Sequence, residues 1–280
     1  MKPINNTVDD LFQPRELAEG EYLNEADGLI YCSKCHTARQ HRIELKERVF
    51  LPTVRCRCQQ EEYEKEEAER KHQEFLMQVS RLRANGLQDK SLYDYNFAND
   101  KGYNPKMQKA HDYVAHWEEM KTKSLGLLLW GDVGTGKSFF AGCIANALLD
   151  KGVPVLMTNF SRILNTLTGM YSDDRNQFID SFNKYSLLII DDLGIERSSE
   201  FALEQVFNVI DSRYRSKKPL IVTTNLTLDE LKHPKDLVRA RIYDRVLECC
   251  VPLKINNQNI RELNAAANMQ EARKILNSGT

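Results

Sequence analysis

The sequence has no long run of apolar residues, almost no net charge and no internal repeat. Its longest apolar run, residues 125–130, is far shorter than the roughly 20 residues that a membrane-spanning helix requires. The start, MKPINNTVDD, lacks the apolar region of a signal peptide, so we expect a cytoplasmic protein with no membrane partner. A formal net charge of −1 at pH 7 argues against a generally polybasic nucleic-acid binder, so any DNA contact must come from a local patch.

The composition is that of an ordinary globular protein, with 41% hydrophobic and 28% charged residues. A chain of 280 residues can form one large α/β core and a smaller appendage, because single cores usually stop growing near roughly 250 to 300 residues. After Cys58 the composition changes sharply, and QQEEYEKEEAERKHQEF contains hardly an apolar residue. We therefore expect a small N-terminal domain over residues 1–59, a charged linker helix over 60–80 and a large domain over 81–280.

Within the large domain, short apolar runs alternate with amphipathic stretches, which is typical of a parallel sheet covered by helices. Between the third and fourth runs, apolar side chains from Leu203 to Tyr214 recur at helical spacing. This pattern predicts an α/β fold, a three-layer sandwich with a parallel sheet. The predicted strands are residues 125–130, 153–158, 186–190 and 219–224.

A phosphate-binding loop is expected between the first predicted strand and the helix FFAGCIANALL, where the sequence reads GDVGTGKS. Its glycines let the backbone approach phosphate oxygens, Lys137 reaches the β and γ phosphates, and the hydroxyl of Ser138 ligates Mg²⁺. The following helix points its N-terminal amides at the same anion. The pattern therefore predicts a site for ATP and Mg²⁺, formed by Gly131, Asp132, Val133, Gly134, Thr135, Gly136, Lys137 and Ser138.

A nucleoside triphosphatase also needs a carboxylate beside the metal ion, and LLIIDD places Asp191 at the end of a buried strand. We predict that Asp191 holds the metal and that Asp192 orients or deprotonates the attacking water. A turn-capping role for Asp192 is the alternative. Asn225, which ends the strand motif VTTN, stands where its amide can polarise the same water.

Arginines near the C-terminus are candidates for stabilising charge on the transferring phosphoryl group, an effect worth roughly 10³ to 10⁵ in rate. Three lie in RARIYDR and one in NNQNIRE. They are Arg239, Arg241, Arg245 and Arg261.

The order GDVGTGKS, LLIIDDLGIE, IVTTN and RIYDR resembles the AAA+ ATPases over about residues 80–265. Within them it is most similar to the bacterial and phage replicative helicase loaders of the DnaC and DnaI type, with the transposition helper IstB as a near relative. The resemblance implies an AAA+ fold, slow and partner-controlled ATP hydrolysis, and self-association through AAA+ interfaces. It also implies a replicative hexameric helicase and single-stranded DNA as partners.

The resemblance assigns a role to seven residues. Asp192 stands where most AAA+ members carry Glu, although DDLG is usual in this subgroup, and Glu196 is a second candidate for activating water. An arginine finger acts on the nucleotide of a neighbour, so active sites would form between subunits. The matches are Lys137 and Ser138 for Walker A, Asp191 and Asp192 for Walker B, Asn225 for sensor 1, Arg245 for the arginine finger and Arg261 for sensor 2.

Four of the seven cysteines lie close together near the N-terminus, as Cys32 and Cys35 in a CxxC motif and Cys56 and Cys58 in a CxC motif. Four thiolates suit tetrahedral Zn²⁺, so we predict a structural zinc site. His36 or His41 in place of one sulfur, and unrelated free thiols, are the alternatives. With four protein ligands the metal would have no open position for catalysis, and it would stabilise a domain too small to hold itself together.

Basic residues surround these cysteines and allow three interpretations: contact with DNA phosphates, a solvated face, or a protein-docking surface. In the loader family the extra N-terminal domain binds the helicase, which favours docking. The residues are Arg39, His41, Arg42, Lys46, Arg48, Arg55 and Arg57.

Three functions follow from the sequence. The leading one is an ATP-dependent DNA replication protein that loads the replicative hexameric helicase onto single-stranded DNA, with ATP binding and hydrolysis as the switch between assembly and release. The second is an IstB-like ATPase helper of a DNA transposase. The third is an adaptor that binds ATP without appreciable hydrolysis.

Overall fold

A computed structural model describes residues 16–45, 48–194 and 199–277 of the chain. Packing divides the protein into two compact units, residues 1–76 and residues 77–280. Within the described ranges, no helix combines the length and the apolar character that crossing a bilayer demands.

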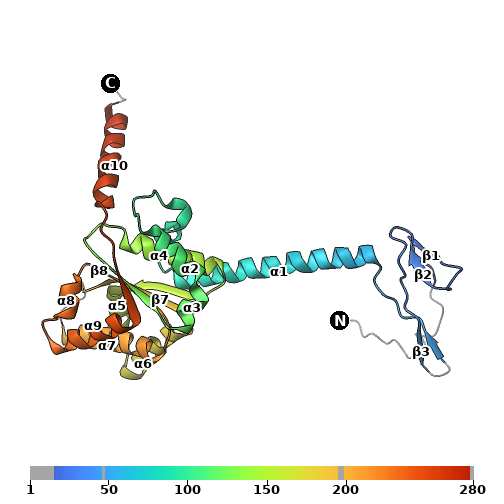
Figure 1. The fold of residues 1–280 in the computed structure, drawn as a ribbon, viewed down its shortest axis with the longest axis horizontal. Helices are drawn as coiled ribbons and strands as arrows, with labels where there is room; N and C mark the ends of the chain where they lie inside the picture. Colours follow the sequence, from blue (N-terminus) through green and yellow to red (C-terminus); the bar gives the residue numbers. More distant parts are fainter. Residues whose placement is uncertain (1–15, 46–47, 195–198, 278–280) are drawn as a thin grey trace. The chain divides into compact units, whose positions relative to one another are not determined.

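The first unit consists of two antiparallel strand pairs and the first part of a long helix (Figure 1). Strand β1 (Glu21–Leu23) pairs with β2 (Ile30–Cys32), and β3 (Ile43–Leu45) pairs with β4 (Arg48–Phe50). Isolated two-stranded pairs are marginally stable in water. This unit therefore needs a further source of stability.

Helix α1 (Arg57–Gly86) belongs to both units. Ion pairs along its surface, such as Arg70 with Glu67 and Glu74, each stabilise an exposed helix by a few tenths of a kcal/mol. The predicted linker helix lies within α1, and the predicted domain boundaries at residues 59 and 80 both fall inside it. The helix ends at Gly86, where a Cβ atom would lie 2.0 Å from the carbonyl oxygen of Val155. Only glycine fits this contact with the sheet.

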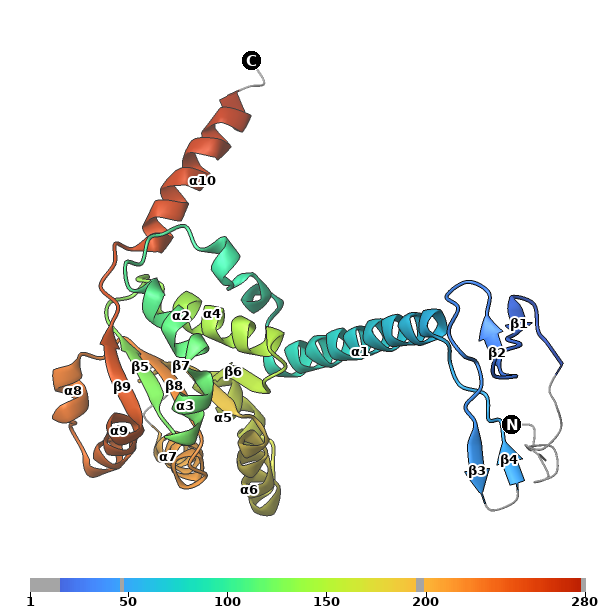
Figure 2. The same cartoon turned by 45° about the vertical axis from the view of Figure 1, so that its right-hand side comes forward.

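The second unit contains a five-stranded parallel sheet in the order β6-β7-β8-β5-β9 (Figure 2). Four strands overlap the four predicted apolar runs, and the fifth, β9, lies outside them. Because the strands are parallel, their carboxyl ends meet at one edge, where open α/β sheets bind ligands. The strands are β5 (Gly126–Trp130), β6 (Val155–Asn159), β7 (Leu187–Leu193), β8 (Leu220–Thr224) and β9 (Cys250–Lys254).

Helices cover both faces of this sheet and produce three layers, because alternate strand residues such as Leu127 and Leu128 enter opposite cores. One face packs against α2 (Met107–Ala115), α3 (Trp117–Thr122) and α4 (Lys137–Asp150). The other packs against α5 (Phe160–Thr168), α6 (Ser172–Ser181), α7 (Glu200–Arg215), α8 (Leu228–Lys232) and α9 (Leu237–Cys249). The remaining helical elements are η2 (Lys90–Asp94), η3 (Phe97–Asn99), η4 (Phe182–Lys184) and α10 (Ile260–Asn277).

Candidate nucleotide site

The predicted phosphate loop joins β5 to α4 at the carboxyl edge of the sheet. Its backbone turns at Gly134 and Gly136, whose φ angles of 81° and 89° lie in the left-handed region that glycine adopts most easily. Lys137 begins α4 and is buried, and its ammonium donates to the carbonyl oxygens of Gly131 at 2.8 Å and Asp132 at 2.7 Å. Burial lowers the pKa of Lys137, while the nearby carboxylates oppose that shift.

Lys137 also connects the phosphate loop to β8, because its Nζ atom donates to Oδ1 of Asn225 at 2.7 Å. Asn225 directly follows β8, which is the neighbour of β5 in the sheet. The Walker A and sensor 1 positions predicted from the sequence are therefore in direct contact.

Asp191, near the end of β7, contacts the start of α4 and the neighbouring strand β8. Its Oδ1 atom accepts a hydrogen bond from the hydroxyl of Ser138 at 2.9 Å and one from the hydroxyl of Thr223 at 2.6 Å. A hydroxyl and a carboxylate so close together are the oxygen donors that Mg²⁺ takes beside nucleotide phosphates. Ser138 and Asp191 thus fit a magnesium site.

Asp192 lies beside Asp191 but has a left-handed backbone, with φ of 62°. Burial, and to a lesser extent the charge of Asp191, raises the pKa of its carboxyl group. A raised pKa makes Asp192 a stronger base than an ordinary exposed aspartate, which suits a group that accepts a proton from water.

Several of the residues predicted for the site border one cavity of about 410 Å³. Lys137, Ser138, Asp192, Asn225 and Arg261 all line it, so the structure brings together most of the residues predicted for the site. Arg261 reaches it from the start of α10, and the backbone N–H of the preceding Ile260 donates to the carbonyl oxygen of Gly134 at 2.9 Å.

The other wall of the cavity was not predicted from the sequence. It comes from the segment before and at the start of α2, which includes the η3 turn. Asn146 of α4 holds this segment by donating to the carbonyl oxygens of Leu92 and Tyr95, at 2.8 Å and 2.9 Å. The lining residues are Tyr95, Asn99, Asp100, Lys101, Tyr103, Asn104 and Met107. The aromatic cluster in SLYDYNF was the available signal, but short 3₁₀ turns have no periodicity to reveal their role.

The predicted arginine finger is placed differently from the residues that line the cavity. Arg245 on α9 is not among the described residues that line the cavity; its Nε atom pairs with Oδ1 of Asp211 at 2.7 Å, and its guanidinium lies over the ring of Phe207. A finger that acts on a neighbouring subunit need not reach its own cavity. Glu196 lies outside the described residues.

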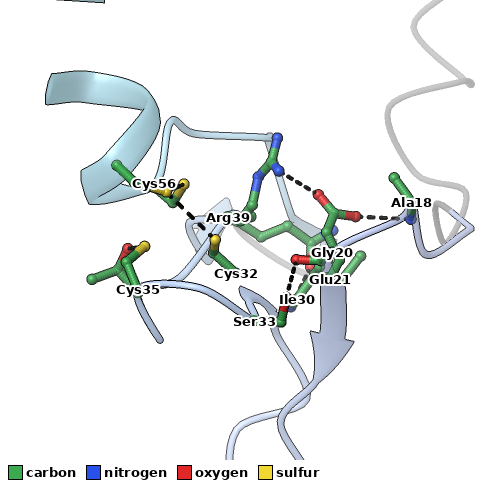
Figure 3. A network of polar contacts seen from close by, with 12 residues as sticks. Ala18, Gly20, Glu21, Ile30, Cys32, Ser33, Cys35, Arg39 and Cys56 are labelled. Atoms are coloured by element: carbon green, nitrogen blue, oxygen red, sulfur yellow. Dashed lines mark hydrogen bonds and ion pairs between the residues drawn. The ribbon is translucent and has the colours of Figure 1, made fainter. Parts of the chain in front are cut away.

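The predicted metal cluster of the first unit is formed by Cys32, Cys35, Cys56 and Cys58, whose sulfur atoms all lie within 4.8 Å of one another. Figure 3 labels the first three of these cysteines. The sulfur of Cys58 lies 3.7 Å from that of Cys32 and 3.3 Å from that of Cys56. Tetrahedral zinc with Zn–S bonds of about 2.3 Å separates its sulfurs by about 3.8 Å. The cluster therefore fits Zn²⁺.

Hydrogen bonds support the cysteine cluster from the surrounding loop. The hydroxyl of Thr37 and the backbone N–H of Cys58 lower the pKa of Cys35 to about 5, as suits a thiolate ligand. His36 instead contacts the hydroxyl of Tyr22 at 3.2 Å, and among the described residues neither it nor His41 belongs to the cluster. The alternative with a histidine ligand is not supported.

An ion pair fixes the strand next to this cluster. Arg39 pairs with Glu21 of β1 at 3.0 Å, and the second carboxylate oxygen of Glu21 accepts the backbone N–H of Ala18 (Figure 3). Arg39, one of the basic residues considered for DNA contact, is thus engaged within the unit.

Comparisons with known proteins agree with this architecture. The family described as "IstB-like ATP binding protein" matches residues 56–267. The replicative helicase loader DnaC of Escherichia coli K12 is 27% identical over 143 residues, which are 50% of this chain and 56% of that protein. The replicative helicase loader DnaI of Bacillus subtilis 168 is 25% identical over 165 residues, covering 55% and 53%. The chain thus matches about half the length of these curated relatives.

A solved structure shows the same fold. The crystal structure of DnaI superposes with a TM-score of 0.50 at 23% sequence identity, covering 61% of this chain and 93% of that one. The AAA+ α/β fold predicted from the sequence is confirmed.

Replacing Lys137 tests the nucleotide site. Lys137→Ala removes the charge that faces the phosphates, so ATP affinity should fall at least about tenfold and hydrolysis should be lost. Titration with a fluorescent ATP analogue and a phosphate-release assay measure the two effects. Lys123→Ala, at the exposed residue that directly follows α3, is the matched control and should behave like the parent. Parent-level hydrolysis by Lys137→Ala would rule out this site.

Metal analysis tests the cysteine cluster. Protein purified without chelators should contain about one zinc per chain, and Cys32→Ser should lower that content and unfold the first unit, because metal binding and folding are coupled. ATP binding should persist. Cys249→Ser, outside the cluster, should keep its zinc. Parent protein without zinc would contradict the assignment.

Proposed function

Because this chain belongs to the IstB-like ATP-binding protein family, we propose that it loads a replicative hexameric helicase onto single-stranded DNA, with ATP as its switch. The observation that carries this proposal is the convergence of Lys137, Ser138, Asp191, Asp192 and Asn225 at one sheet edge. The choice of a replicative helicase as the partner rests on the two relatives that are named replicative helicase loaders. Loading of a bacterial or phage helicase would take place in the cytoplasm.

ATP hydrolysis is assigned to these residues as follows. The amides of the phosphate loop and the charge of Lys137 bind the phosphates, and Ser138 with Asp191 holds Mg²⁺, which neutralises charge on the transferring phosphoryl group. Asp192 accepts the proton of the attacking water, and Asn225 orients that water. Arg261 contacts the nucleotide of its own subunit.

The hydrogen-bond partners of Lys137 suggest how nucleotide binding would change the conformation of the phosphate loop. The three N–H donors of its ammonium are all engaged, by the carbonyls of Gly131 and Asp132 and the side-chain oxygen of Asn225, so at least one of these partners must be exchanged for a phosphate oxygen when nucleotide binds. The same loop is tied to the segment before α10, because Asn257 donates to the carbonyl of Thr135 at 3.1 Å. A nucleotide-dependent shift of the loop would therefore reach α10, whose described side chains from Arg261 onward are exposed and available for contact with neighbouring subunits.

The first unit is assigned to helicase docking. Its zinc cluster would keep the two short strand pairs folded, and exposed residues such as Ile43 and Val49 supply apolar contact area. Single-stranded DNA is assigned to the second unit, where assembly through AAA+ interfaces would align successive subunits.

A second function is an ATPase helper of a DNA transposase, which the match to the IstB-like family favours because the sequence also resembles the transposition helper IstB. The two differ in their clients. A loader acts on a helicase and single-stranded DNA, whereas a transposase helper acts on double-stranded target DNA.

A loading assay tests the proposed function. The protein should increase unwinding by the replicative helicase of the same genome on DNA coated with single-strand binding protein, and Lys137→Ala should not. Failure to bind that helicase, together with ATP-dependent binding of double-stranded DNA, would favour the transposase helper. ATP binding without hydrolysis in every mixture would favour the adaptor.

The trans role of Arg245 is tested by mixing subunits. Arg245→Ala should keep the ATP affinity of the isolated subunit but lose hydrolysis, because an arginine finger acts mainly on charge developed in the transition state. Mixed with inactive Lys137→Ala, it should recover part of the ATPase activity.

Arg215→Ala is the matched control, since Arg215 pairs with the same Asp211 at 2.7 Å and is exposed. It should retain hydrolysis. No recovery in mixtures that co-assemble would exclude Arg245, and would direct the search to Arg241, whose side chain is exposed one turn earlier on α9.

A further inference from the structure

Two adjacent aspartates at the end of β7 both serve the nucleotide site, although successive side chains of a strand point to opposite faces. Asp191 binds Ser138, and Asp192 lines the cavity with Lys137. A regular strand would direct one of the two carboxylates away from the site. A local irregularity in the strand must therefore turn both carboxylates toward the same site.

The pairing of β7 with β8 contains that feature. Ile190 lies opposite Val222, but the next pair is Leu193 with Thr224. Two residues, Asp191 and Asp192, therefore face the single residue Thr223. This is a β-bulge, an irregularity that bends a strand and redirects a side chain.

The side chain of Thr223 occupies the centre of the bulge and is fully buried. Its hydroxyl donates to Oδ1 of Asp191 at 2.6 Å and accepts the backbone N–H of Asp192 at 2.9 Å. One hydroxyl thus fixes the carboxylate of the first aspartate and the backbone of the second. That backbone is left-handed, which is unfavourable for a residue with a Cβ atom unless its surroundings hold it.

The next residue of β8 secures the far side of the bulge. The hydroxyl of Thr224 donates to the carbonyl oxygen of Leu193 at 2.7 Å. The two threonines differ in one respect: Thr223 contacts a carboxylate of the site, and Thr224 contacts only backbone.

We propose that Thr223 is a positioning residue for ATP hydrolysis, which holds the bulge that turns Asp192 into the site and orients the carboxylate of Asp191 toward Ser138. This inference rests on the proposed ATPase activity.

Two substitutions of Thr223 distinguish a positioning role of its hydroxyl from a packing role of its side chain. Valine has nearly the shape of threonine but can neither donate nor accept a hydrogen bond, whereas serine keeps the hydroxyl and loses a methyl group. A packing role predicts that Thr223→Val is harmless and that Thr223→Ser is the more harmful change. The positioning role predicts the opposite order.

The kinetic test compares these variants in the full chain. Thr223→Val should lower kcat by about 10- to 100-fold, the scale of misplaced catalytic groups, while ATP affinity changes less than about threefold. Thr223→Ser should stay within about threefold of the parent kcat. Thr158→Val is the matched control: Thr158 is a buried β6 residue whose hydroxyl contacts Gln88 at 3.2 Å, and its loss should not alter kcat.

Hydrogen exchange at the Asp192 amide provides a readout that needs no activity. NMR of the nucleotide-free protein should show this amide protected in the parent and in Thr223→Ser, and exchanging at least about tenfold faster in Thr223→Val. Parent-level kcat or unchanged protection in Thr223→Val would overturn the proposal. If the parent hydrolyses no ATP, either alone or with the helicase and single-stranded DNA, the proposed function fails, and the exchange rates alone decide whether Thr223 holds the bulge.

Discussion

The carboxylate of Asp191 joins three segments that are far apart in the sequence. It stands near the end of β7 and accepts hydrogen bonds from Ser138 at the start of α4 and from Thr223 on β8. Because β7 and β5 lie on either side of β8 in a parallel sheet, their carboxyl ends can converge on one point. The phosphate loop, the candidate metal ligands and the candidate water-activating residue are all arranged around this carboxylate.

The sequence predicts those parts of the site whose residues are contiguous and follow a recognisable pattern. GDVGTGKS and LLIIDD identify Lys137 and Asp191, because a phosphate and its metal require these groups at these places. It does not predict the bulge at Thr223, since strand register depends on pairing between distant segments. The cavity wall around Tyr95 and the ion pair between Arg245 and Asp211 were not predicted from the sequence either. Both depend on contacts between residues far apart in the sequence, which the local spacing of apolar residues does not reveal.

The first unit is too small to be stabilised by a hydrophobic core. Strands of three residues form little core, so its stability must come from elsewhere, and the four cysteine sulfurs lie at spacings that suit one tetrahedral ion. The sequence predicted this cluster because cysteine spacing is itself the signal. Under the proposed function, the surface that such an ion would support recognises the client, and the second unit supplies the response to the nucleotide.

A crystal structure with Mg²⁺ and a non-hydrolysable ATP analogue tests this account most directly. The account predicts the triphosphate on the amides of the loop from Asp132 to Ser138, with the metal on the hydroxyl of Ser138 and beside Asp191. It also predicts that the ammonium of Lys137 exchanges at least one of its partners, the carbonyls of Gly131 and Asp132 and the side-chain oxygen of Asn225, for a phosphate oxygen. A nucleotide bound elsewhere, or a metal remote from Ser138 and Asp191, would contradict it.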